Sequence, residues 1–347
     1  MKYLRWLLLP FSIVYGLVVM MRNWLYDAGL FESRSYTKPV ISVGNLDVGG
    51  AGKSPMTEYL IRMLKNDHRL ATLSRGYGRA TKGFVLADAI TGATELGDEP
   101  AQFKQKFPDV TVAVCEKRTV GIERLLPQHD VVLLDDAYQH RAVKPGFSLL
   151  LFDHGRLSGP QLLLPAGNLR EPFVGRYRAD VLVVTKCPAN LTEVQQQKAL
   201  QKLKPLSYQQ VYFTSISYMP LQDIYGKRKG ELPPAGSKIF VLTGIANSDP
   251  LIGHLNYLQL EVVHHNYPDH HQFSLKNITK LAADLQHNAP PGTMVITTEK
   301  DAQRLRQPEL LPHVEALPIY VLPIGVMFLN DAEKRFNETI QNYVRQY

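Results

Sequence analysis

Short runs of apolar, often β-branched residues alternate with longer stretches of mixed polarity along most of the chain. In the first two thirds of the sequence, six such runs cover residues 40–43, 69–73, 110–114, 131–134, 149–152 and 181–184. Runs that are apolar throughout predict strands buried on both faces, and the stretches between them are long enough for crossover helices. The expected fold class is therefore α/β, a mostly parallel sheet with helices on both faces.

A second and smaller set of elements follows residues 226–237, a stretch rich in Pro, Gly and Lys that we expect to be a linker. After it, strands are expected at residues 239–242, 261–264, 294–297 and 319–321, and helices from about residue 249 and over 275–287. The expected domains are thus a first α/β domain at 38–225 and a second, smaller α/β domain at 238–347. A last helical stretch, 330–345, could return to either domain.

Residues 1–37 differ from the rest because they contain an almost uncharged apolar run from Trp6 to Met21. As a helix rising about 1.5 Å per residue, the run is ~24 Å long, which is shorter than the ~30 Å hydrocarbon layer of a membrane. Cations and tryptophans flank both ends of the run: Lys2, Arg5, Trp6, Arg22 and Trp24. They favour an apolar N-terminal helix that lies in the membrane interface. A marginal membrane span and a helix buried on the protein's own core are the alternatives. The lack of a small-x-small cleavage site argues against a secretory signal.

The composition excludes several classes of protein. With 347 residues, 45% of them apolar, the chain can build ordinary cores, so disorder and a collagen-like fold are excluded. Cys115 and Cys187 lie far apart without a CxxC pair, which excludes a disulfide scaffold and a cysteine zinc site and favours a reducing, cytosolic compartment. The net charge of +7 suits anionic partners. The basic residues are spread along the chain without interleaved aromatic residues, so no nucleic-acid partner is expected.

The first predicted strand runs into a glycine-rich segment, residues 44–54 with the sequence GNLDVGGAGKS, and then into a helix with apolar periodicity. A strand, a glycine loop and a helix in this order form the phosphate cradle of P-loop NTPases, so the expected sheet is P-loop NTPase-like. The expected ATP-binding residues are Asp47, Val48, Gly49, Gly50, Ala51, Gly52, Lys53 and Ser54. In such a loop, backbone N–H groups and the lysine bind phosphate oxygens, and the serine hydroxyl binds Mg²⁺. Asp47 is a departure, because the strict motif has glycine at that position.

An acidic pair, Asp135 and Asp136, follows the strand predicted at 131–134. A carboxylate at the tip of a parallel strand beside a phosphate loop is placed to anchor Mg²⁺. Taken alone, such a pair is also typical of a turn or a helix cap. The neighbouring phosphate loop favours the metal-binding interpretation.

Two further pairs of charged residues are candidates for the remaining chemistry. Asp98 and Glu99 precede a helical stretch, and on their own they are equally well explained as an acidic first turn. Arg170 and Glu171 lie in a loop bounded by Pro residues, at 164–172. Surface ion pairing is the alternative there.

The second domain contributes two adjacent histidines in the segment 267–273, YPDHHQF. Neighbouring histidines do not face one metal ion from a helix, so His270 and His271 favour a general base or proton relay over a zinc site, with Asp269 fixing a tautomer. A polar loop that caps the next helix is the alternative. Segment 297–301, TTEKD, is typical of a strand end that enters a helix through an N-cap.

Seven blocks, taken together in this order and spacing, resemble the tetraacyldisaccharide 4′-kinase family. They cover residues 44–55, 74–79, 97–100, 134–140, 164–172, 268–271 and 297–301. Members of this family phosphorylate the lipid A precursor at the inner membrane of Gram-negative bacteria. The resemblance spans nearly the whole chain, including the apolar amino end.

The resemblance implies a reaction and roles for the candidate residues. ATP would donate its γ-phosphoryl group to the 4′-hydroxyl of a tetraacyldisaccharide 1-phosphate, a late step in lipid A biosynthesis. Asp98 and His270 would be the catalytic pair, which requires the second domain to close over the active site. The ligands of Mg²⁺ would be Ser54, Asp135, Asp136 and Glu171. The lipid acceptor would be bound by Arg75, Tyr77, Arg118, Gln139 and Arg170.

The implied location is the cytoplasmic face of the inner membrane, with the N-terminal helix on the membrane surface. The alternative function is a membrane-linked P-loop NTPase that acts as a switch or adaptor without a lipid acceptor. Guanine specificity is not expected, because Thr185 and Pro188 stand where a guanine-reading motif has Asn and Asp.

Overall fold

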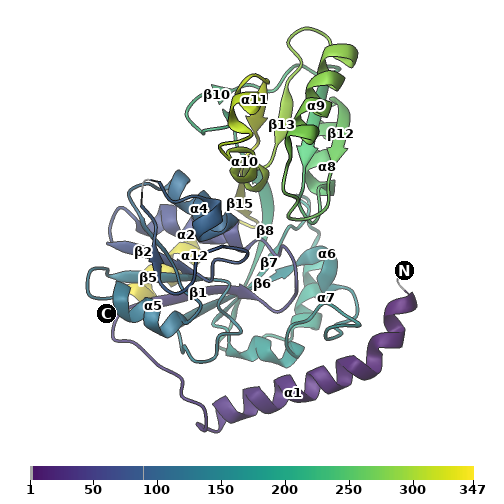
Figure 1. Ribbon diagram of the computed structural model, residues 1–347. Coiled ribbons are helices and arrows are strands. Elements are labelled where there is room, and N and C mark those ends of the chain that lie inside the picture. The colour runs from purple at the N-terminus through teal and green to yellow at the C-terminus, as the bar shows by residue number, and fades with distance from the viewer. Residues whose placement is uncertain (1–2, 89) are drawn as a thin grey trace.

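The structure is a computed structural model that describes residues 3–88 and 90–347 and contains two separate sheets (Figure 1). Lys2, one of the cations expected at the membrane, lies outside the described residues. Figure 1 shows the second sheet and its helices at one end of the molecule and the N-terminal helix at the other.

The first sheet has nine strands within the described residues, in the order β15-β8-β7-β6-β1-β5-β2-β4-β3. Their bounds are β1 Val40–Asn45, β2 Leu70–Ser74, β3 Val85–Leu86, β4 Thr111–Val114, β5 Val131–Asp135, β6 Phe147–Asp153, β7 Val181–Thr185, β8 Gln210–Tyr218 and β15 Ile324–Phe328. All neighbours from β4 to β8 pair in parallel, and the edge strands β3 and β15 are antiparallel. All six strands predicted in this part of the chain are confirmed.

Helices cover both faces of the first sheet. The longer ones are α2 Lys53–Leu64, α4 Asp98–Lys106, α5 Arg118–Leu125, α7 Glu193–Leu203 and α12 Glu333–Val344; shorter ones are α3 Ala93–Leu96, α6 His154–Leu157 and the 3₁₀ helix η2 Phe173–Arg178. Met56 of α2, Phe103 of α4 and Phe336 of α12 belong to one buried cluster, which covers one face. Ile122 of α5 and Leu203 of α7 are buried against side chains of the opposite face. The predicted P-loop NTPase-like α/β class is therefore confirmed.

The second sheet has six strands within the residues described, in the order β10-β9-β14-β13-β11-β12. The strands are β9 Leu221–Asp223, β10 Lys229–Gly230, β11 Lys238–Thr243, β12 Glu261–Asn266, β13 Val295–Thr297 and β14 Ile319–Val321, and the helices are α8 Asp249–Tyr257, α9 Leu275–Asn288, α10 Glu299–Leu305 and α11 Leu311–Glu315. The strands from β12 to β14 are parallel, and β9 and β10 form an antiparallel edge. The predicted elements of the smaller α/β unit are all present.

The chain passes between the two sheets at places other than the predicted linker. It enters the second sheet between β8 and β9 and returns between β14 and β15. Met219 N–H donates to Pro323 O at 2.9 Å, so the two crossings lie side by side. Residues 226–237 instead contain β10, and their Pro and Gly content reflects turns at an exposed sheet edge. The predicted second domain, 238–347, is therefore too long at its end: β15 is a strand of the first sheet, and α12 packs against that sheet.

The N-terminal segment consists of the 3₁₀ helix η1 (Tyr3–Leu8) and α1 (Leu9–Asp27). Only a narrow stripe of α1 is buried, at Ser12, Gly16 and Val19. Large apolar side chains are exposed along the rest of the segment: Trp6, Leu7, Phe11, Ile13, Val14, Leu17, Val18, Met20, Met21 and Trp24. This exposure contradicts the alternative of a helix buried on the protein's own core. By length and composition alone, Arg5–Asp27 could also cross a membrane.

Helix α12 fastens the end of the chain to the first sheet. Phe336 is fully buried, and its ring lies 4.6 Å from that of Phe328 and 5.2 Å from that of Tyr212, centroid to centroid. We predict that Phe336→Ala lowers the free energy of unfolding by about 3–5 kcal/mol, because it removes a buried ring and leaves a cavity. Urea denaturation followed by circular dichroism measures this loss. Met327→Ala, on the exposed side of β15, is the matched control and should cost far less; equal losses would contradict the placement of α12.

Candidate active site

The glycine loop has the form expected of a phosphate cradle. It begins where β1 ends at Asn45 and finishes where α2 begins at Lys53. Gly49 has a φ of +103° and Gly52 a φ of +84°, in the left-handed region that favours glycine. A Cβ at Gly49 would also lie 2.8 Å from the guanidinium of Arg156. The loop therefore needs glycine at both positions.

Lys53 and Asp47 set the charge of this loop. Lys53 Nζ lies 3.1 Å from Asn45 Oδ1 and 3.7 Å from Asp136 Oδ1. Burial, together with the charge of Asp153, raises the pKa of Asp47 against the opposing effect of Arg156. Burial thus opposes the ionised form of this residue, which is unusual at its position in a phosphate loop.

Asp135 and Asp136 end β5 beside the loop, as predicted. Asp136 accepts two hydrogen bonds from Arg170, at 2.8 Å on Oδ1 and 3.2 Å on Oδ2. Burial opposes the ionisation of Asp136, but the charges of Lys53 and Arg170 outweigh it and lower its pKa. Asp136 is therefore held as a carboxylate.

The pKa of Asp135 is shifted in the opposite direction to that of Asp136. Its carboxylate is buried and is contacted by the hydroxyls of Thr57 and Ser74, each at the long distance of 3.4 Å. Burial, with the nearby charges of Asp136 and Glu99, raises the pKa of Asp135 to about 6. A carboxylate can accept about four hydrogen bonds, so Asp135 has acceptor capacity to spare. With Asp136 and the Ser54 hydroxyl, it offers oxygen ligands of the kind that Mg²⁺ prefers.

Glu171 does not fit the predicted role of a metal ligand. It is fully buried, and both of its carboxylate oxygens accept hydrogen bonds: Oε2 from Arg178 at 2.8 Å and from Asn23 at 3.3 Å, and Oε1 from Gln139 at 3.0 Å. Gln139 Nε2 also donates to Asn45 O at 2.8 Å. These donors occupy the carboxylate, so Glu171 joins α1 to the loop beside the site and is not available to a metal.

The structure brings Asp98 and His270 together. Asp98 comes from a helix of the first sheet, and His270 comes from a loop of the second sheet, between β12 and α9. Asp98 is the first residue of α4, and its Oδ2 lies 3.5 Å from His270 Nδ1. His270 has a φ of +58°, and its N–H donates to Gly244 O at 3.0 Å and to Asp269 Oδ1 at 3.1 Å. The predicted proximity of the two side chains is thus observed without any further movement of the second sheet.

Two cations of α10 complete this group, and the sequence interpretation gave neither of them a role. Lys300 Nζ donates to Glu99 Oε1, and Arg304 donates to Asp98 Oδ2 from Nη2 at 2.6 Å and from Nε at 3.0 Å. Burial opposes the charge of Lys300, but Glu99 outweighs it and raises the pKa of this lysine. The only sequence signal was the four-residue spacing of Lys300 and Arg304, which places both on one helix face. The N-cap predicted for TTEKD is confirmed, because Thr298 Oγ1 accepts from Asp301 N–H at 3.2 Å.

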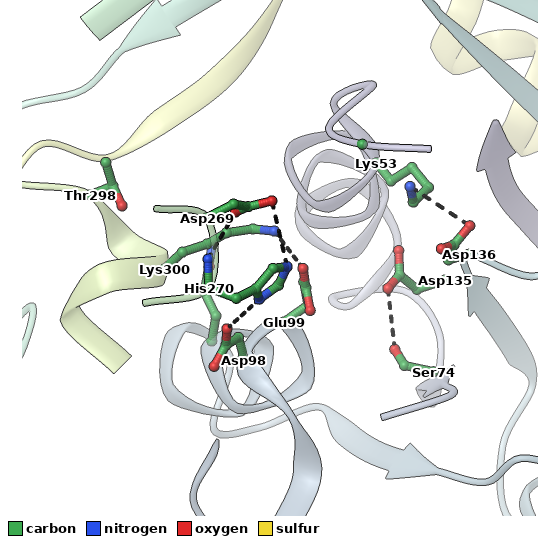
Figure 2. A network of polar contacts seen from close by, with 12 residues as sticks. Lys53, Ser74, Asp98, Glu99, Asp135, Asp136, Asp269, His270, Thr298 and Lys300 are labelled. Carbon is green, nitrogen blue, oxygen red and sulfur yellow. Dashed lines mark hydrogen bonds and ion pairs between the residues drawn. The ribbon is translucent and has the colours of Figure 1, made fainter. Parts of the chain in front are cut away.

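Figure 2 shows these two groups facing each other. Asp98, Glu99, His270 and Lys300 lie on one side, and Lys53, Asp135 and Asp136 lie on the other. Glu99 and Lys300 are close enough to Asp135 for their charges to act on its ionisation in opposite directions. The arrangement can hold a phosphorylated ligand on one side and a proton acceptor on the other.

The residues predicted to bind the acceptor differ in their exposure and in their hydrogen bonds. Tyr77 is exposed, and its ring centroid lies 5.8 Å from that of His270. A cavity of about 370 Å³ is lined by residues 75–82 and Glu116. Arg118 is buried and donates to Cys115 O at 2.9 Å, and burial lowers its pKa to about 10.

This side of the site is rich in positive charge. Burial, together with the charges of Arg118, Arg75 and Arg22, lowers the pKa of His140 to about 4. The guanidinium of Arg170, by contrast, is already committed to Asp136 and Asn45.

Comparison with known proteins gives one family. The family model described as "Tetraacyldisaccharide-1-P 4'-kinase" matches residues 4–345. A tetraacyldisaccharide 4′-kinase of Flavobacterium johnsoniae is 46% identical over 352 residues, covering 100% of this chain and 99% of its own. One of Phocaeicola vulgatus is 42% identical, covering 99% and 96%. A crystal structure of LpxK from Aquifex aeolicus, described as an "apo" form in complex with ATP, is similar with a TM-score of 0.74 and 29% identity, covering 98% of this chain and 99% of that one.

The raised pKa of Asp135 predicts an unusual dependence of stability on pH. An unfolded aspartate titrates near 3.9, so between about pH 4 and 6 the folded protein keeps a proton that the unfolded chain has released. The free energy of unfolding should therefore fall by up to ~3 kcal/mol as the pH rises through this window. Asp135→Asn should lack this fall, as measured by urea denaturation from pH 4 to 8 in the presence of a chelator.

A matched control is Asp88→Asn. Asp88 is exposed, and the N–H groups of Ile90 and Thr91 lower its pKa, so its contribution to stability has the opposite sign with pH. Identical pH profiles for Asp135→Asn and the unmodified protein would contradict the buried carboxyl.

Proposed function

The chain belongs to the tetraacyldisaccharide-1-P 4′-kinase family, and on that premise we propose how its residues carry out the reaction. The protein is an ATP-dependent kinase that transfers the γ-phosphoryl group of ATP to the 4′-hydroxyl of a tetraacyldisaccharide 1-phosphate in lipid A biosynthesis. The family match and the named relatives give no support to the alternative of a switch or adaptor.

ATP binds, in this proposal, with its phosphates on residues 47–54. The backbone N–H groups of the loop and the N-terminus of α2 face the phosphates, and Lys53 reaches the β- and γ-phosphates. Ser54, Asp135 and Asp136 would hold Mg²⁺, and the ion would supply positive charge against the transferred phosphoryl group. The spare acceptor capacity of the buried Asp135 carboxylate supports this assignment.

Asp98 and His270 act on the acceptor. The observation that carries this proposal is the 3.5 Å contact between His270 Nδ1 and Asp98 Oδ2, on the side of the site that faces Lys53. The pair draws the proton from the 4′-hydroxyl as its oxygen attacks the γ-phosphorus, while the bond from the γ-phosphorus to the bridging oxygen breaks and ADP leaves. Because phosphoryl transfer has a loose transition state, positioning and charge supply most of the rate enhancement.

The acceptor lies, we propose, against Tyr77 and the cations Arg75 and Arg118. The effect of these arginines on His140 indicates a cluster of positive charge at this place. A 1-phosphate group is a dianion that suits guanidinium groups. Arg170 does not take part directly, because Asp136 and Asn45 hold it.

Helix α1 brings the enzyme to its insoluble acceptor. In this proposal its apolar face, which is exposed in the structure, lies in the cytoplasmic surface of the inner membrane, where ATP is available. The buried stripe binds the loop at 163–171: Ser12 Oγ donates to Leu163 O at 3.0 Å, and Tyr15 Oη donates to Arg170 O at 2.7 Å. The same loop pairs with the phosphate loop, since Val48 N–H donates to Asn168 O at 2.8 Å. One loop therefore separates the membrane helix from the ATP site.

A direct assay tests the function. Incubation with γ-labelled ATP, Mg²⁺ and tetraacylated glucosamine disaccharide 1-phosphate in detergent should give labelled lipid. Lys53→Ala should abolish this transfer, because the phosphates lose the only cation of the glycine loop. His270→Ala should lower kcat by about 10²–10⁴-fold, because His270 acts on the acceptor hydroxyl, while KM for ATP stays within about threefold.

The control for His270 is His287→Ala, an exposed histidine on α9 that should leave the rate unchanged. Release of phosphate without labelling of the lipid would favour the switch instead. A near-normal rate for Lys53→Ala or His270→Ala would remove the role given to that residue.

The membrane proposal has a built-in probe. The chain contains two tryptophans, Trp6 and Trp24, and both are exposed on the N-terminal segment. Vesicles of anionic phospholipid should shift the tryptophan emission to shorter wavelength. Val14→Glu and Leu17→Glu should each weaken vesicle binding at least about tenfold, because each removes an apolar side chain worth roughly 1.5–3 kcal/mol on burial.

Val194→Glu is the matched control, since Val194 is equally exposed but lies on α7. An unchanged emission spectrum with vesicles, or equal loss of binding for Val194→Glu, would contradict the assignment of α1 as the membrane contact.

A further inference from the structure

Arg304 is a buried cation at the centre of the Asp98–His270 group. Its side chain is 1% exposed, although arginine is almost never fully buried without partners. Its Nε and Nη2 both donate to Asp98 Oδ2, at 3.0 and 2.6 Å. Its Nη1 donates to Gly244 O at 2.9 Å and to Asp301 Oδ1 at 3.2 Å. Each nitrogen of the guanidinium is thus bound to a neighbour in the fold.

The hydrogen bonds to Asp98 leave one carboxylate oxygen available. Both go to Oδ2, and no donor among residues 3–88 and 90–347 contacts Oδ1. The Asp98 side chain is 15% exposed, so a ligand can reach its carboxylate, and Oδ1 is the oxygen that Arg304 leaves free. A guanidinium that binds one oxygen from two nitrogens fixes the rotation of the carboxylate. Arg304 therefore orients Asp98.

The same side chain also holds the backbone that carries His270. Gly244 O accepts from Arg304 Nη1 and from His270 N–H, at 2.9 and 3.0 Å. Gly244 N–H in turn donates to Asp301 Oδ1 at 3.1 Å. Arg304, Asp301 and Gly244 thus form a closed set of hydrogen bonds that is joined to the backbone N–H of His270. Arg304 Nη2 lies 3.4 Å from His270 Nδ1, so it also faces the ring itself.

We propose that Arg304 is a positioning residue of the kinase: it binds Asp98 Oδ2 across the interface between the two sheets, leaves Oδ1 to accept the proton of the acceptor hydroxyl, and fixes His270 beside it. This inference rests on the proposed roles of Asp98 and His270. Arg304 itself touches neither substrate. Its removal should lower the rate of the chemical step and leave the binding of ATP nearly unchanged.

The test is kcat and KM of Arg304→Gln. The variant keeps a long polar side chain but loses the charge and the planar fork. We expect kcat to fall about 10²-fold, the cost of a small misplacement of reacting groups, with KM for ATP within about threefold. Arg304→Lys restores the charge without the fork and should recover part of kcat. It also keeps the test decisive if the glutamine variant fails to fold, since full activity of Arg304→Lys would contradict the need for the fork.

The pH profile of kcat separates positioning from a merely structural role. The groups that face Asp98 are Arg304, Lys300 and Asp301 from α10, His270 from its loop, and Glu99 beside it on α4. Loss of the guanidinium removes the nearest cation and frees the carboxylate to rotate, so the shape of the pH profile should differ from that of the unmodified protein. A purely structural defect would lower kcat by the same factor at every pH and leave the shape of the profile unchanged.

A double-mutant cycle provides the second readout. If Arg304 acts through Asp98, Arg304→Gln should cost little further activity in an Asp98→Asn background, whereas independent effects would multiply. Gln303→Ala is the control at the same interface, because Gln303 binds Gln105 at 2.7 Å, away from Asp98, and it should leave kcat unchanged.

The outcomes also separate this inference from the proposed function. Full activity of Asp98→Asn and His270→Ala would overturn the catalytic pair itself. Loss of activity in those variants, together with an unchanged kcat and pH profile in Arg304→Gln or with multiplying losses in the cycle, would overturn the role of Arg304 alone.

Discussion

The site depends on the pairing of charges between two helices from different sheets. Helix α10 presents Lys300 and Arg304 on one face, and these cations bind Glu99 and Asp98 at the start of α4. A further contact follows along the same helices, where Lys106 of α4 lies between Glu58 of α2 and Glu299 of α10. Partly buried charges are costly unless they are paired, so these ion pairs set how the two sheets sit against each other. That placement is what brings His270 to Asp98.

A second connection runs from the membrane helix to the phosphate loop. The segment at 163–171 accepts hydrogen bonds from Ser12 and Tyr15 on one side and pairs with the phosphate loop on the other. Glu171, the buried last residue of this segment, accepts hydrogen bonds from Asn23 of α1 and from Arg178. The helix that would enter the membrane is therefore attached to the part of the molecule that binds ATP, and the second sheet lies at the far end (Figure 1).

Local features were predictable from the sequence, and long-range ones were not. The glycine loop and the Asp135–Asp136 tip follow from short-range spacing, and the structure has both where they were expected. The contact of Asp98 with His270 came from the family resemblance and not from any local pattern. Arg304 was missed because nothing near it in the chain indicates that its partner is the carboxylate of Asp98.

The errors have the same physical origin. Glu171 is assigned as a metal ligand only through the family resemblance, and nothing near it in the sequence indicates that other side chains already bind its carboxylate. Its donors come from three separate places in the chain. Similarly, the Pro and Gly residues at 226–237 indicate turns but not whether those turns join domains or lie at a sheet edge.

The most direct test of the proposed mechanism is a crystal structure with Mg²⁺, a non-hydrolysable ATP analogue and the disaccharide acceptor. It should show Arg304 on Asp98 Oδ2, the acceptor 4′-hydroxyl on Oδ1, and that oxygen in line with the γ-phosphorus beside Lys53. A 4′-hydroxyl bound elsewhere, with Asp98 and His270 apart, would contradict the account.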